Sequence, residues 1–128
     1  MPNAELYVGL MSGTSADCID AAVANFANGR CQLVATHSTY ISDRRTEIHA
    51  LAQPGDNEIQ RLVQLDRELG IRFAETVNQL LANHQLSHSE IIAIGSHGQT
   101  IRHRPDLKHR FSLQIGDASQ ITHLTGIT

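Results

Sequence analysis

The alternation of apolar and polar positions predicts three strands at the start of the chain. A short apolar run over 5–11 stops at the small polar cluster Ser12-Gly13-Thr14-Ser15, which is typical of a buried strand that enters a tight loop. Two further alternating runs follow, over 19–26 and over 31–41. The dipeptide Asn28-Gly29 between them is a strong hairpin signal. We therefore expect three successive strands.

The spacing of apolar residues then changes to that of helices. A short helix is expected over 44–52, followed by a longer one with Asp56 or Asn57 as its N-cap. Gly70 lies inside the longer helix and indicates either a kink or the close approach of another backbone. The apolar positions of this helix recur at threes and fours: Ile59, Leu62, Leu69, Phe73, Val77 and Leu80.

The apolar run over 91–95 predicts a central parallel strand that is covered on both faces. Because it follows a long helix, it completes a βαβ unit, and the predicted order of elements is βββαβ. Alternation over 111–115 predicts another strand, which we expect to pair with 100–104 as a hairpin.

A last short helix is expected after this hairpin, capped by Asp117. In it, Ile121 and Leu124 are expected to face inward, and Gly126 takes the position after the helix end. Ile127-Thr128 resembles the start of a further strand, so we expect the chain to stop at an element boundary, incomplete at its C-terminus.

Composition narrows the class of protein. A chain of 128 residues with 41% hydrophobic and 18% charged residues is one domain's worth of globular sequence. A net charge of −3 provides no positive field for phosphate backbones or anionic lipid, so neither nucleic acid nor a membrane is an expected partner. Two separate cysteines do not form a disulfide framework, and reduced thiols favour a cytoplasmic location.

The first candidate site is the polar segment between the first two predicted strands. Residues 12–20 contain three hydroxyls, one glycine and two carboxylates. A glycine-containing turn of this kind can hold a phosphate, and Asp17 and Asp20 can hold Mg²⁺ through water. The segment is not a P-loop, because no lysine is close in sequence. The alternative is that the hydroxyls satisfy turn backbone groups and Asp20 faces solvent. The residues alone leave both interpretations open.

The second candidate site follows the predicted central strand, at the carboxyl end where α/β sheets bind ligands. His97, Gln99 and Thr100 offer hydrogen bonds suited to a polyhydroxylated substrate, and Gly98 allows close backbone approach. The alternative is a strand end whose polar side chains cap neighbouring carbonyls.

Two further clusters carry weaker signals. Histidines at 97, 103 and 109 recur regularly, but no acid or cysteine completes a metal site, and solvated histidines on a basic hairpin are the better explanation. The basic residues at 102, 104, 108 and 110 indicate a solvated hairpin tip rather than a contact to an anionic substrate.

Three motifs together resemble the anhydro-N-acetylmuramic acid kinases of peptidoglycan recycling. They are Met11–Asp17 with Ile19-Asp20, then Gly95–Thr100, then Gln114–Asp117. The resemblance implies an actin-like, ribonuclease-H-like kinase of two lobes. It also implies that ATP is the phosphate donor. Such a kinase opens the 1,6-anhydro ring of its sugar with water and transfers the γ-phosphate to O6.

The resemblance also implies roles for individual residues. Residues 1–128 would be the N-terminal part of the first lobe, and the second lobe and the water-activating base would lie beyond Thr128. The chain alone would then be inactive. Residues expected to contact the ATP phosphates are Ser12, Gly13, Thr14, Ser15, Ala16, Asp17, Cys18 and Ile19. Residues expected to face the sugar are His97, Gly98, Gln99, Thr100 and Asp117.

One residue departs from the family pattern, which has glycine where this chain has Cys18. If that backbone needs a positive φ, the side chain would strain the loop by roughly 1–2 kcal/mol. Two alternative functions also stay open. The chain could belong to another actin-like phosphotransferase or phosphatase, or it could be a non-catalytic module that pairs with a partner, such as a second copy, through an open sheet edge.

Overall fold

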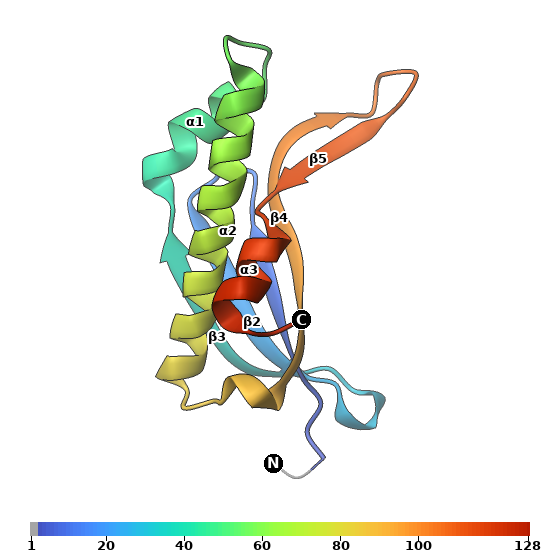
Figure 1. Cartoon of the computed structure of the whole chain (residues 1–128). Coiled ribbons are helices and arrows are strands. Elements are labelled where there is room, and N and C mark those ends of the chain that lie inside the picture. Colours follow the sequence, from blue (N-terminus) through green and yellow to red (C-terminus); the bar gives the residue numbers. More distant parts are fainter. Residues whose placement is uncertain (1–2) are drawn as a thin grey trace.

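The computed structural model describes residues 3–128 and contains one mixed five-stranded sheet with helices on one face (Figure 1). The strand order is β3-β2-β1-β4-β5. β1 is antiparallel to β2 and parallel to β4, while β2–β3 and β4–β5 are antiparallel pairs. The predicted α/β class and βββαβ order are therefore confirmed. The strands are β1 (Leu6–Ser12), β2 (Cys18–Asn25), β3 (Gln32–Tyr40), β4 (Ile91–Arg104) and β5 (Phe111–Ile115).

The β2–β3 hairpin forms where the Asn28-Gly29 dipeptide predicts it. Both residues have positive φ, 62° and 67°, as the favoured hairpin turns require. The pairing brings Tyr40, at the end of β3, opposite Cys18, at the start of β2. The segment that follows β3 therefore returns to the loop between β1 and β2.

The helices pack on one face of the sheet. Leu69, Phe73, Val77 and Leu80 of the longest helix are buried as predicted, but Ile59 is 78% exposed. The first turn of α2 lies beside the second half of β4, where Glu58 accepts a hydrogen bond from Arg102, and Ile59 is left open to solvent there. The helical segments are η2 (Ser42–Arg44), α1 (Arg45–Ala50), α2 (Glu58–Asn83), η3 (His88–Glu90) and α3 (Ala118–Thr125), with the single turn η1 (Ala27–Gly29) between β2 and β3.

The N-cap of α2 differs from the sequence expectation in one respect. Asn57 occupies the cap position, but it has a left-handed backbone and its side chain makes no capping hydrogen bond. Gly70 is where another backbone approaches. A Cβ there would lie 2.7 Å from the Asp117 carbonyl oxygen, and α2 runs through this position without a break. The close approach is therefore confirmed, and it allows α3 to pack on α2.

β4 corrects two sequence expectations. It is one continuous strand, Ile91–Arg104, rather than two separate segments. Its first half pairs with β1 and its second half pairs with β5, with a register shift between them. It is also covered on one face only, and Ile92 is 50% exposed. The apolar residues on both faces of β4 therefore did not mean that both faces of this strand are buried.

The last helix begins and ends as predicted. Asp117 Oδ1 accepts a hydrogen bond from the Ser119 amide at 2.9 Å, and Gly126 closes the helix with a φ of 72°. Ile121 is buried, but Leu124 is 42% exposed, because α3 packs on α2 along a narrower stripe than the sequence suggests. Beyond the helix, the Thr128 carbonyl accepts a hydrogen bond from the Ile94 amide of β4 at 2.8 Å.

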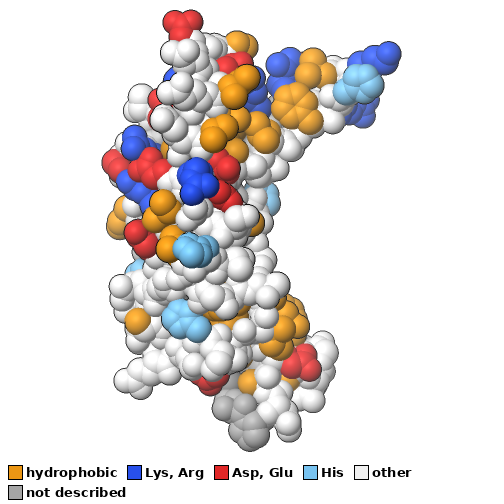
Figure 2. Space-filling view, in the orientation of Figure 1, with side chains coloured by type: hydrophobic (Ala, Val, Ile, Leu, Met, Phe, Trp, Pro, Cys, Tyr) orange, Lys and Arg blue, Asp and Glu red, His pale blue; other side chains and the backbone are white. Residues whose placement is uncertain are grey.

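The outer surface carries a basic projection. Figure 2 shows Lys and Arg side chains gathered at the end of the β4–β5 hairpin, which extends away from the helices. Arg104, Lys108 and Arg110 are exposed there, as the solvated-tip interpretation expects. Arg102 is separate from this group, because it donates to the Leu51 carbonyl at 3.0 Å and to Glu58 at 2.6 Å. Within residues 3–128, no helix combines the length and hydrophobicity needed to cross a bilayer.

Candidate functional site

The loop between β1 and β2, residues 13–17, is a tight turn. The Ala16 amide donates to the Gly13 carbonyl at 3.0 Å, and Ala16 has a left-handed backbone with a φ of 54°. The Ala16 methyl group is buried, while Thr14 and Ser15 are exposed. The turn thus anchors in the core through one small side chain and presents two hydroxyl groups to solvent.

Gln99 connects this loop to the second sequence motif. Its side chain is 0% exposed. Its Oε1 accepts a hydrogen bond from the Ser12 hydroxyl, and its Nε2 donates to the carbonyls of Gly13 and Thr100, both at 3.1 Å. The two motifs, 87 residues apart in sequence at Ser12 and Gln99, therefore form one unit.

This position changes the role of Gln99. Both Nε2 hydrogens are used by backbone carbonyls, so the amide offers no donor to an external sugar in this structure. The cause is the register shift in β4: Ser96 pairs with Leu10, yet Gln99 pairs with Ser12. The extra residue reverses the alternation and turns Gln99 from the open face of the sheet toward the core. Ser12 is itself buried, 1% exposed, and its hydroxyl is used in this contact.

His97 lies on the open face of the sheet. It lines a shallow depression of about 630 Å³ at the base of the 13–17 loop. Small residues at three neighbouring positions make the surface concave there. The lining also includes polar groups suited to a hydroxylated ligand. Its residues are Gly9, Leu10, Met11, Asp20, Ala21, Ala22, Thr36, Ser38, Gly95 and His97. The structure therefore places His97 and Asp20 in the lining of one depression.

The other residues expected near the sugar are placed differently. Gly98 is buried with a φ of 77°, and a Cβ there would lie 2.6 Å from the Ile115 carbonyl oxygen. Thr100 Oγ1 accepts a hydrogen bond from Gln114 at 3.2 Å. Asp117 contacts the α3 backbone and Arg67 of α2, at 3.5 Å, rather than His97. The expected grouping of Asp117 with His97 is not found in this structure.

Asp20 is the exposed carboxylate of the site. It accepts a hydrogen bond from the Ser38 hydroxyl at 2.6 Å and one from the Cys18 thiol at 3.6 Å. Burial, together with the nearby Asp20 carboxylate, raises the pKa of Cys18, so this thiol is not an activated nucleophile. Cys18 does not have a positive φ, and the strain expected for a side chain in place of glycine does not arise.

No cluster of three or more His, Cys, Asp or Glu side chains within residues 3–128 is arranged to hold a metal ion directly. His103 and His109 are exposed on the projecting hairpin, away from the depression that His97 lines.

The contribution of α1 to the 13–17 loop was not predicted from the sequence. Arg45, its first residue, forms an ion pair with Asp17, and His49 Nε2 lies 3.3 Å from the Thr14 carbonyl oxygen. Just before α1, the Ile41 amide donates to the Asp17 carbonyl at 2.9 Å. The predicted hairpin could have indicated this contact. Pairing of β2 with β3 about Asn28-Gly29 brings the residues after β3 back to the loop before β2.

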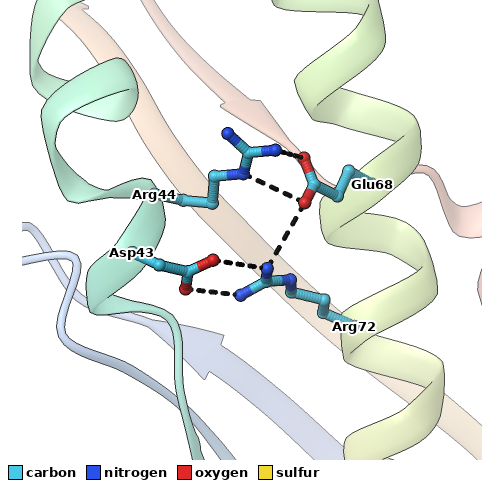
Figure 3. A network of polar contacts seen from close by, with 4 residues as sticks. All are labelled: Asp43, Arg44, Glu68 and Arg72. Carbon is cyan, nitrogen blue, oxygen red and sulfur yellow. Dashed lines mark hydrogen bonds and ion pairs between the residues drawn. The ribbon is translucent and has the colours of Figure 1, made fainter.

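A network of charged side chains fixes this segment to α2 (Figure 3). Arg72 binds both carboxylate oxygens of Asp43, at 2.7 and 2.6 Å. Glu68 accepts from Arg44 at 3.0 Å and from Arg72 at 3.3 Å. The hydrogen bonds from Arg72 hold the pKa of Asp43 below its usual range. Arg44 and Asp43 together attach η2, and with it α1, to two successive turns of α2.

This pKa shift predicts a pH-dependent effect. Because the folded pKa of Asp43 lies below the ordinary value of 3.8, its contribution to stability is present above that value and is lost as the pH falls through the folded pKa. Asp43→Asn should therefore lower the free energy of unfolding near neutral pH and have less effect at about pH 3. Urea unfolding at both pH values measures this. In an Arg72→Gln background the pH dependence of the Asp43→Asn effect should be absent, and its persistence there would contradict the assignment.

Known proteins similar to this chain belong to the family that the three motifs resemble. A family model described as anhydro-N-acetylmuramic acid kinase matches residues 5–128. A protein of that name from Shewanella sp. strain ANA-3 is 50% identical over 126 residues, which is 98% of this chain and 34% of the relative. Proteins of the same name from Shewanella oneidensis and Shewanella amazonensis are 49% and 46% identical, over 98% and 95% of the chain.

The chain thus spans about a third of the length of these relatives. The matched region contains both candidate motifs, the 13–17 loop and the 97–100 segment, together with the Gln99 contact that joins them. The motif order, the fold and the match over nearly all of the described residues agree, and the chain belongs to the anhydro-N-acetylmuramic acid kinase family.

Proposed function

We propose that this chain provides the ATP-phosphate loop and part of the sugar-facing surface of an ATP-dependent anhydro-N-acetylmuramic acid kinase. The reaction opens the 1,6-anhydro ring with water and phosphorylates O6. The contact of Gln99 with Ser12 and Gly13 is the observation that carries this proposal, because it joins the two motifs into one site. The names of the relatives support the same activity.

The 13–17 loop would bind the phosphates of ATP. Exposed Thr14 and Ser15 hydroxyls and the amides of a tight turn are suitable donors to anionic oxygens. Residues 1–128 would form the N-terminal part of the first actin-like lobe. The second lobe and the base that activates water would come from outside these residues. Phosphoryl transfer depends on positioning by both walls of a cleft, so we expect this chain alone to bind nucleotide without turnover.

Mg²⁺ would accompany ATP in this site. Asp20 fits such an ion, because it is an exposed carboxylate beside the loop, and Mg²⁺ usually keeps several waters and binds through one or two carboxylates plus substrate phosphates. Asp17 is the second candidate, although it already pairs with Arg45. When bound, the ion would neutralise charge on the transferred phosphoryl group.

The sugar would lie against the open sheet face beside His97. The depression there is lined by the hydroxyls of Thr36 and Ser38 as well as by the imidazole, which together can donate to and accept from sugar hydroxyls. Gly95 and Gly9 leave the surface free of bulky side chains at its centre. A ring of moderate size can therefore approach the backbone closely.

Location and oligomeric state are part of the proposal. The free thiols of Cys18 and Cys31 support a cytoplasmic location. A second copy of the chain is a candidate partner through β3, an edge strand on which Leu33 and Tyr40 are exposed. Sedimentation equilibrium should then show concentration-dependent dimers, and a monomer at all concentrations would contradict this partner.

Ligand binding to the chain tests the proposed function. Calorimetric titration should detect binding of ATP with Mg²⁺, and saturation-transfer NMR should detect 1,6-anhydro-N-acetylmuramic acid in preference to glucose. No ADP should form with the chain alone. Preference for common hexoses would indicate another actin-like phosphotransferase. Dimerisation without any nucleotide effect would indicate a binding module, and rapid turnover would show that the chain contains its own base.

A further inference from the structure

The 13–17 loop and its surroundings lack a cation in local sequence. Asp17 and Asp20 both lie beside the turn, and no lysine or arginine occurs between Met1 and Arg30. A polyphosphate would therefore meet like charge at this loop unless a positive group arrives from elsewhere in the fold. The P-loop solves the same problem with a lysine within its motif.

The fold brings one arginine to this position. Arg45 of α1 forms an ion pair with Asp17, and its side chain is 46% exposed. A guanidinium group has five N–H donors, and Asp17 is its one ion-pair partner among the described residues. Because nearly half of the side chain is exposed, a ligand in solvent can reach donors that Asp17 does not use. Arginine is also the residue best suited to phosphate oxygens, because its planar fork binds them in pairs.

The backbone of Arg45 is held firmly while its guanidinium end stays accessible. Asp43 and Arg44, the residues before it, are fixed to α2 by the network in Figure 3. On the other side, His49 lies one helical turn further along α1 and contacts the Thr14 carbonyl at 3.3 Å. The base of the Arg45 side chain is therefore fixed relative to the 13–17 loop.

We propose that Arg45 is a phosphate-binding residue of the 13–17 loop. It pairs with Asp17 in the structure described here, and it donates to the polyphosphate of a bound nucleotide, taking the place of the lysine that the loop lacks. This inference rests on the proposed function, since it names a further residue of the same site. It does not depend on Mg²⁺ and can be tested without metal or turnover.

The test is calorimetric titration of the chain with inorganic tripolyphosphate in the absence of metal. Arg45→Gln should weaken binding at least tenfold, and Arg45→Lys should weaken it less, because it keeps the charge but loses the fork. The matched control is Arg67→Gln. It removes the same charge from an arginine of α2 that pairs with Asp117. The control should bind like the original chain. Thermal unfolding should change little in each variant, because the Arg45 and Arg67 side chains are 46% and 60% exposed and ion pairs of exposed side chains contribute little.

Arg45 could instead act only by holding Asp17 in place. The Asp17→Asn variant distinguishes that positioning role from phosphate binding. If Arg45 binds phosphate, Asp17→Asn removes a competing carboxylate and should strengthen tripolyphosphate binding, and Arg45→Gln should still weaken binding in the Asp17→Asn background. If Arg45 only positions the loop, Asp17→Asn should weaken binding and Arg45→Gln should add nothing to it. That second pattern would overturn the inference, as would unchanged binding by Arg45→Gln alone. Failure of the original chain to bind tripolyphosphate would instead count against the proposed function itself.

Discussion

Replacement of Gln99 by leucine should destabilise the chain by about 2–4 kcal/mol, because it leaves the buried Ser12 hydroxyl unpaired and removes the hydrogen bonds to the Gly13 and Thr100 carbonyls. The Ser12 hydroxyl and the Gly13 carbonyl both lose a hydrogen bond to the Gln99 amide. Leucine is close to glutamine in size, so the loss of polar partners dominates over the creation of a cavity. Urea unfolding measures the change in free energy, and calorimetry should show weaker ATP binding as the loop loses its support.

A paired substitution separates the unsatisfied groups from general damage. Ser12→Ala combined with Gln99→Leu removes the orphaned hydroxyl and should recover about 1 kcal/mol relative to Gln99→Leu alone. Phosphate binding should not recover, because the hydrogen bond that ties the Gly13 carbonyl to β4 is still missing. If Gln99→Leu unfolded at the same urea concentration as the original chain, with the same slope, the contact would not be holding the loop.

Gly98→Ala should also destabilise the chain strongly. At a φ of 77° an L side chain costs about 1–2 kcal/mol, and the overlap of its Cβ with the Ile115 carbonyl, 2.6 Å away, adds about 1–3 kcal/mol. We therefore expect a total loss of about 2–5 kcal/mol in the free energy of unfolding. The same change should disturb the adjoining Gln99 contact and weaken nucleotide binding.

Gly95→Ala is the matched control on the same strand. Its Cβ would meet no atom within 4 Å, and Gly95 does not have a positive φ. Its effect on stability should be within about 1 kcal/mol, the usual difference between glycine and alanine in an extended segment. An equal loss of stability in Gly98→Ala and Gly95→Ala would mean that β4 does not require the positive φ and close packing of Gly98.

The fold was largely predictable because periodicity reports which face of an element is buried. Leu69, Phe73 and Val77 lie one turn apart on α2 and are all buried. Periodicity does not report which turns of a helix are left uncovered, and Ile59, in the first turn of α2, is exposed. Nor does it report whether a second layer covers a strand, so the apolar run around Ile92 indicated more burial than β4 has.

The candidate site was predictable in position but not in the roles of its residues. Motif composition located the loop at 13–17 and the polar segment at 97–100. The direction of Gln99 depends on one extra residue in the β4 register, and strict alternation cannot show such a shift. Arg45 reaches the loop through the β2–β3 hairpin, and this contact follows from tertiary structure rather than from a local motif.

We propose the 13–17 loop as the place where this chain binds nucleotide. Amide NMR titration with ATP and Mg²⁺ tests it most directly, because each residue reports separately. We expect saturable shifts at Gly13 to Asp17, with smaller shifts around Gln99 and α1. Shifts confined to the basic hairpin tip at 104–110, or no shifts at the loop at saturating ATP, would contradict it.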